Sequence, residues 1–101
     1  MTSDTLTANQ KECAVIAIEE MAELTKVLSK ILRFGLDENK ELEMAQEIGD
    51  VLCLIQLLHD NYNIGYDVTS KATERKQVKL MKWSNLYDYK MDQLKLKWSK
   101  L

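Results

Sequence analysis

Proline is absent from the 101-residue sequence, and glycine occurs only three times. These two residues most often interrupt helices and form turns, so their scarcity leaves few places where a helix has to end. The chain is rich in leucine, lysine, glutamate and methionine, which favour helices. We therefore predict an all-α fold in one small domain over residues 1–101, with a core at about residues 10–87 and a tail at 84–101.

The sequence also lacks a strong charge of either sign, since its formal net charge is −2. That value gives no electrostatic reason to expect a nucleic-acid partner. No run of about 18 apolar residues is present, and the first ten residues lack the apolar stretch of a secretory signal peptide. We expect a soluble, cytoplasmic protein with neither a nucleic-acid nor a membrane partner.

Cysteine is scarce, with Cys13 and Cys53 the only two. They form no CxxC pair, and each falls within an apolar pattern of helical spacing. We expect two buried thiols in a reducing compartment.

Apolar residues recur at helical spacing in three long segments of the chain. The first predicted helix covers residues 10–34, with Asn9 as its N-cap and Gly35 just past its C-terminal end. The second covers residues 39–61 and follows a cap at Asp37. Because the connection is short, these two helices should form an antiparallel hairpin.

A third helix is predicted over residues 67–82, and Ser84 is a candidate cap for a short fourth helix at residues 85–98. The second helix is apolar around most of its circumference, which requires burial on more than one side. A chain of this length buries only about 60–65% of its unfolded surface. We therefore expect a homo-oligomer, a dimer or a tetramer, in which the tail forms an interface helix.

The segment IEEMAEL at residues 18–24 places Glu19, Glu20 and Glu23 inside an otherwise apolar pattern. Glu47 and Asp50 form a second acidic pair beside the apolar stripe of the second predicted helix. Taking carboxylates out of water is costly unless a cation or a donor network compensates. Either these side chains face solvent, or a positive group belongs between them.

In the hairpin, the two acidic segments lie at similar distances from the turn. Glu20 lies 15 residues before Gly35 and Glu47 lies 12 after it, which corresponds to about 22 and 18 Å along the two helices. Four facing carboxylates, those of Glu20, Glu23, Glu47 and Asp50, would repel strongly without a cation. We interpret them as an oxygen-ligand site for Mg²⁺ or Mn²⁺, which are hard ions that prefer carboxylates.

The ordered pair of motifs, E-E-x-x-E and then E-x-x-D after 23 intervening residues, resembles the signature of the MazG-like all-α nucleoside triphosphate pyrophosphohydrolases. The segments SKILRFG (29–35) and KATERKQVKLMKWSNLY (71–87) are similar to those of small phage and bacterial members. The resemblance covers roughly residues 10–87. It implies a homo-oligomer that hydrolyses (deoxy)nucleoside triphosphates to monophosphate and pyrophosphate with Mg²⁺.

The resemblance also implies roles for individual residues. It makes Glu20, Glu23, Glu47 and Asp50 the metal ligands, and it gives Glu19 a supporting part, in which it orients the site or acts as a base toward water. Residues 71–100 carry nine Lys or Arg against three Asp or Glu, which suits an anionic ligand. The candidates for holding the phosphates are Lys71, Arg75 and Lys79, which are spaced four apart, and then Lys30 and Arg33.

Two alternatives remain open at this point. The same site could serve a different triphosphate-like substrate, as in the phosphoribosyl-ATP pyrophosphohydrolases. The chain could also be a non-catalytic helical oligomerisation or regulatory module whose acids are only surface charge. The non-catalytic hypothesis differs from the two enzyme hypotheses in one testable respect. Only an enzyme requires the acidic side chains to converge in space.

Overall fold

A computed structural model describes residues 5–87, and these form three α-helices and no strand. They are α1 (Ala8–Phe34), α2 (Glu38–Tyr62) and α3 (Tyr66–Trp83). The all-α prediction is confirmed, and each helix begins and ends within two residues of its predicted position. None of the helices in this part of the chain is long and apolar enough to cross a membrane.

The N-terminal end of α1 differs from the prediction. The N-cap is Thr7 rather than Asn9, which lies inside the helix. Oγ1 of Thr7 accepts a hydrogen bond from the backbone N–H of Gln10 (3.0 Å), and Oε1 of Gln10 accepts one from the N–H of Thr7 (2.9 Å). This reciprocal capping box satisfies two backbone N–H groups at once, which explains why the helix begins two residues earlier than predicted.

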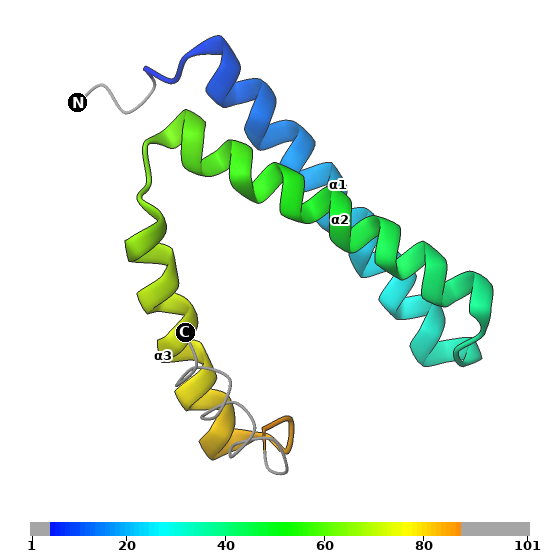
Figure 1. The fold of residues 1–101 in the computed structure, drawn as a ribbon. Coiled ribbons are helices and arrows are strands. Elements are labelled where there is room, and N and C mark those ends of the chain that lie inside the picture. Colours follow the sequence, from blue (N-terminus) through cyan, green and yellow to red (C-terminus); the bar gives the residue numbers. More distant parts are fainter. Residues whose placement is uncertain (1–4, 88–101) are drawn as a thin grey trace. The chain divides into compact units, whose positions relative to one another are not determined.

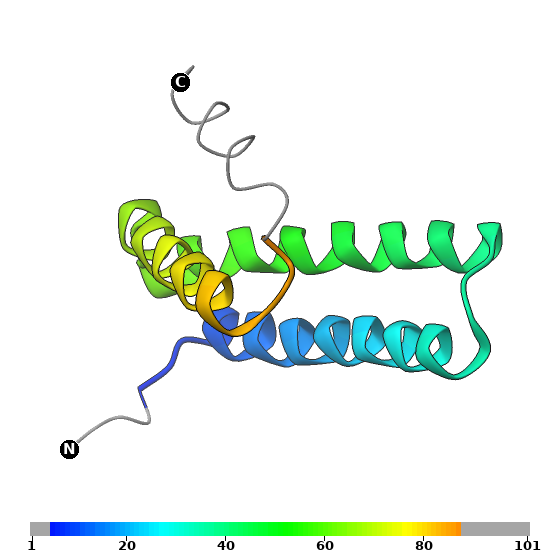
Figure 2. The ribbon, with the colours of Figure 1, turned by 90° about the horizontal axis from the view of Figure 1, so that it is seen from below.

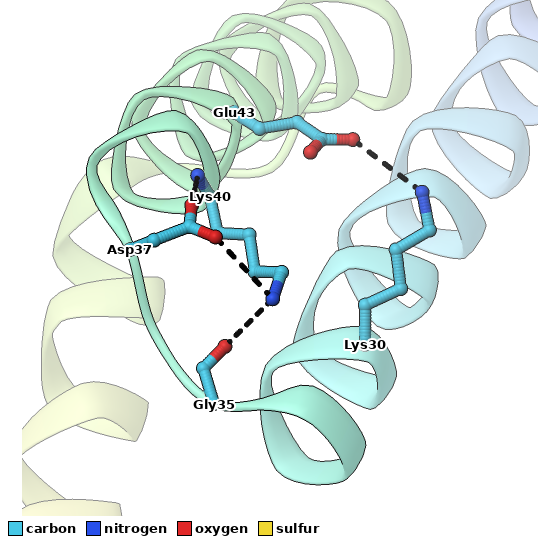
Figure 3. A network of polar contacts seen from close by, with 5 residues as sticks. All are labelled: Lys30, Gly35, Asp37, Lys40 and Glu43. Atoms are coloured by element: carbon cyan, nitrogen blue, oxygen red, sulfur yellow. Dashed lines mark hydrogen bonds and ion pairs between the residues drawn. The ribbon is translucent and has the colours of Figure 1, made fainter.

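The turn between α1 and α2 is held by short polar contacts. Gly35 ends α1 as predicted, with φ +85° and its N–H donating to the carbonyl of Ile31. Asp37 caps α2 as predicted by accepting from the N–H of Lys40 at 2.8 Å. Figure 3 shows the Lys40 ammonium reaching the carbonyl oxygen of Gly35 (3.0 Å) and the carboxylate of Asp37 (3.5 Å). These contacts close the hairpin.

Figures 1 and 2 show α1 and α2 lying side by side and antiparallel, as the short connection requires. Hydrogen bonds between the N-terminal end of α1 and the C-terminal end of α2 fix their register. Nε2 of Gln10 donates to the carbonyl of Asn61, and the hydroxyl of Tyr62 donates to the carbonyl of Gln10, both at 2.8 Å. Next to them, Cys13, Ala17 and Leu54 form the core cluster of the hairpin.

One line of residues on each helix faces the other helix, and we call these two lines the seam. Their members alternate in steps of three and four, as in paired helices that pack knobs into holes. All of them are buried or half-buried: 10, 13, 17, 20, 24, 27 and 31 on α1, and 40, 44, 47, 51, 54, 58 and 61 on α2. Ala17, exposed by only 2%, allows the two helices to approach closely.

The expectation that both thiols are buried is wrong for Cys53. Cys13 lies in the seam and is buried, whereas Cys53 is exposed on another face of α2. Because α2 is apolar on several faces, the sequence alone does not distinguish the seam from the outer surface. Ile48, Leu52 and Ile55 are exposed by 42, 60 and 40% on this helix.

A second compact unit begins at Gly65 and contains α3, which has no buried residue of its own. At its C-terminal end, Ser84 is the C-cap rather than the cap of a following helix. Its Oγ accepts a hydrogen bond from the N–H of Leu86 at 3.1 Å. Residues 85–87 are not helical, and the rest of the predicted fourth helix lies outside the described residues.

Candidate metal centre

Two glutamates occupy seam positions that would otherwise suit apolar residues. Glu20 follows Ala17 by three positions on α1, and Glu47 precedes Val51 by four on α2, so both carboxylates lie on the faces where the helices meet. Both residues are half-buried. The folding of the hairpin therefore brings two acidic side chains together from opposite helices.

Asp50 completes the cluster. It lies three positions after Glu47, at the edge of the seam, and is exposed. One carboxylate oxygen from each of Glu20, Glu47 and Asp50 can be chosen so that all three oxygens lie within 4.8 Å of one another. We call these three residues the carboxylate cluster.

Glu47 is the most constrained member of the carboxylate cluster. Its Oε2 is shielded from solvent and has no hydrogen-bond partner. Loss of hydration raises the pKa of Glu47 above its usual range, and the charges of Asp50 and Glu20 raise it further. Smaller contributions in the same direction come from Glu23 and Glu43. Every described charge that perturbs this carboxylate is therefore negative.

The donor set suits a small, hard divalent cation. Carboxylate oxygens are the preferred protein ligands of Mg²⁺ and Mn²⁺, and Mg²⁺ keeps several waters beside one or two protein carboxylates. Asp50 is exposed at the edge of the seam, which leaves room for such waters. The unpartnered Oε2 of Glu47 would gain the compensating charge that the described protein atoms do not supply.

The remaining two predicted acids lie beside the cluster rather than in it. Glu23 is exposed one turn after Glu20, and its charge contributes to the raised pKa of Glu47. Glu19 is exposed and lies about 100° around the helix from Glu20, so its side chain leaves α1 away from the seam. Of the four carboxylates expected to face one another, the structure brings three together.

The basic residues of α1 lie near the turn of the hairpin. Lys30 and Arg33 follow Glu20 by about 15 and 20 Å along the helix axis. Nζ of Lys30 is 3.8 Å from a carboxylate oxygen of Glu43 on α2 (Figure 3). The guanidinium of Arg33 lies over the ring of Phe34, 5.5 Å from its centroid. The structure thus engages both side chains in local contacts, away from the carboxylate cluster.

The basic residues of α3 share a helix face. Lys71, Arg75 and Lys79 are spaced four apart and are all exposed. They belong to the unit that begins at Gly65. Their common face offers three positive charges to an anion.

Sequence reasoning missed one contributor to the site, Glu43. It lies four positions before Glu47, so the two side chains are neighbours on α2, and its charge raises the pKa of Glu47 while it also pairs with Lys30. The signal was the run of acids at positions 43, 47 and 50 on one helix. The three-four spacing of the seam also indicates that Glu20 belongs to the seam, whereas Glu19 and Glu23 do not.

Comparison of the chain with models of known protein families, with curated proteins and with solved structures gave no match. The description of the site therefore rests on the residues of this chain and on their geometry.

Proposed function

We propose that the chain is a divalent-metal-dependent nucleoside triphosphate pyrophosphohydrolase of the MazG-like type. The convergence of Glu20, Glu47 and Asp50 from two facing helices carries this proposal, because their oxygens lie within 4.8 Å of one another. Surface acids on a non-catalytic module have no reason to occupy a seam. Two of these three acids do so, and one has a buried oxygen without a partner.

Each part of the site has a distinct task in this proposal. Glu20, Glu47 and Asp50 would hold Mg²⁺ or Mn²⁺, and Glu23 would contribute a further oxygen from the exposed side. A bound divalent ion neutralises charge on phosphate oxygens and orients a water for in-line attack. Glu19 is proposed to orient the site or to accept a proton from that water. Hydrolysis would yield a nucleoside monophosphate and pyrophosphate.

The phosphates distal to the cleaved bond need positive partners. Lys71, Arg75 and Lys79 are the proposed partners, because they form an exposed basic face on α3. Lys30 and Arg33 are second candidates, since both already make local contacts near the turn.

A homo-oligomer is part of the same proposal. Ile48, Leu52 and Ile55 are exposed on α2 although they are large and apolar. A second copy of the chain would cover such a surface, and a dimer or a tetramer is proposed on this ground.

The proposal is tested by measuring pyrophosphate release from a panel of ribo- and deoxyribonucleoside triphosphates, with and without Mg²⁺. We expect release that depends on the metal and that Asp50→Asn abolishes without unfolding the chain. Glu41→Gln serves as the control, because Glu41 is an exposed acid on the same helix outside the cluster. Full activity in Asp50→Asn would contradict the metal assignment, and failure to hydrolyse any triphosphate would contradict the enzyme.

A further inference from the structure

A surface hollow of about 190 Å³ lies on the hairpin, between the first turns of α1 and the last turns of α2. Its floor is formed by Cys13, Ile16, Leu54 and Leu57, which are apolar. Cys13 and Leu54 are buried and belong to the core cluster, whereas Ile16 and Leu57 are exposed by 36 and 40%, so the hollow leads from the surface to the core. No role assigned so far involves this hollow.

Two residues that line the hollow lie one helical turn from members of the carboxylate cluster. Ile16 precedes Glu20 by four positions on α1, and Leu54 follows Asp50 by four on α2. Each step is one helical turn, or about 6 Å along the axis. A ligand whose phosphates were held at the carboxylate cluster would therefore extend over this floor if it lay along the hairpin.

Of the three polar residues on the rim of the hollow, one can only accept hydrogen bonds, the carboxylate of Glu12. Asn9, Glu12 and Asn61 line it together with the apolar floor. Nδ2 of Asn61 donates one of its two N–H groups to the carbonyl of Leu57 at 2.8 Å, so this amide can still donate through the other N–H and accept through Oδ1. Glu12 is exposed and forms no ion pair with another described residue, and a carboxylate only accepts.

An obligate acceptor at the edge of an apolar floor, the Glu12 carboxylate, matches an amino group on a flat ring. Cytosine and adenine each carry an exocyclic NH₂ donor, whereas uracil and thymine present a carbonyl oxygen at the equivalent position. That carbonyl would face the Glu12 carboxylate, acceptor against acceptor. The amide of Asn9, which can donate, complements the ring nitrogen next to the amino group.

We propose that this hollow is the base subsite of the enzyme and that it selects cytosine or adenine over uracil or thymine. The proposal rests on the function proposed above, because that function places the phosphates of the same ligand at the carboxylate cluster. Glu12 is the residue that sets the preference. The apolar floor binds any base, and the rim distinguishes among them.

The test compares dCTP with dUTP, which differ at one position of the ring. We expect kcat/KM with Mg²⁺ to favour dCTP by about tenfold or more, as one well-placed pair of polar contacts does. Glu12→Gln should reduce that preference to less than about threefold, because a glutamine amide can either accept or donate. Glu41→Gln should leave the preference unchanged. Equal use of the two substrates by the native chain, or an undiminished preference in Glu12→Gln, overturns the subsite.

A second measurement separates this subsite from the hydrolase itself. Cytidine and uridine, which carry no phosphate, are titrated into the metal-free chain while the methyl resonances of Leu54 and Leu57 are followed by NMR. We expect cytidine to shift these resonances more than uridine does at the same concentration. If neither nucleoside shifts them, the subsite is wrong whether or not triphosphates are hydrolysed. Shifts without hydrolysis of any triphosphate contradict the hydrolase and leave the base preference standing.

Discussion

The substitution Glu47→Gln tests whether the carboxylates of the seam destabilise the folded chain when no cation is bound to them. Oε2 of Glu47 is shielded from solvent without a partner, and burial and neighbouring negative charges raise its pKa. Glutamine has nearly the same shape and no charge, so Glu47→Gln keeps the packing of the seam and removes the repulsion. We expect the metal-free variant to unfold at a higher temperature than the native chain at pH 7.

Addition of Mg²⁺ should reverse this order. A ligand that binds only the folded state stabilises it by about 2.7 kcal/mol at a hundred times its Kd. For a domain of this size each kcal/mol shifts Tm by about 4–8 °C, so the native chain should gain about 10–20 °C. Glu47→Gln should gain far less, since it loses one carboxylate of the three that converge.

Differential scanning calorimetry with and without Mg²⁺ measures both effects. Glu41→Gln is the matched control, because it removes an exposed carboxylate of α2 outside the seam and should gain as much from Mg²⁺ as the native chain. The reasoning is refuted if Glu47→Gln is less stable than the native chain without metal. It is also refuted if the two chains gain equally from Mg²⁺.

Two further predictions concern the hairpin itself. The hydrogen bond from the Lys40 N–H is the main cause that lowers the pKa of Asp37 below 3.8 in the folded chain. The ionised Asp37 carboxylate therefore stabilises the folded chain above pH 3.8, and this stabilisation is lost as the pH falls through the pKa that Asp37 has in the folded chain. Urea unfolding between about pH 2 and 5 should therefore show a steeper acid loss for the native chain than for Asp37→Asn, and parallel curves would argue against this. Leu54→Ala should cost about 2–5 kcal/mol, seen as a lower urea midpoint, because Leu54 belongs to the core cluster. Leu52→Ala, at a position 60% exposed, should change the midpoint little, and equal losses would show that the seam is misplaced.

The helices were predictable because the apolar spacing is regular, proline is absent, and two of the three glycines lie at the turns, with only Gly49 inside a helix. It misplaced the first cap because Thr7 and Asn9 are both good cap residues. The glutamine three positions after Thr7 was the deciding signal, since it permits a reciprocal capping box. Asp37 has a similar competitor in Asn39, two positions later, but the cap there was predicted correctly.

The distance of each acidic residue from the turn, measured along its helix, was also predictable, because the rise per residue and the short turn determine it. Which acids converge was less predictable, because that depends on how each helix is rotated about its axis. Packing of Ala17 near Leu54 sets this rotation, and it places Glu20 in the seam but leaves Glu23 exposed. The exposure of Cys53 has the same origin, since α2 offers more than one apolar face to a partner helix.

The carboxylate cluster is proposed to serve the cleavage of a triphosphate between its α and β phosphorus atoms. Phosphorus NMR of a nucleoside triphosphate incubated with the native chain and Mg²⁺ tests this most directly. We expect nucleoside monophosphate and pyrophosphate in equal amounts with the native chain, and neither product with Glu47→Gln. Formation of diphosphate and orthophosphate, or an unchanged spectrum for every triphosphate tried, would contradict the proposal.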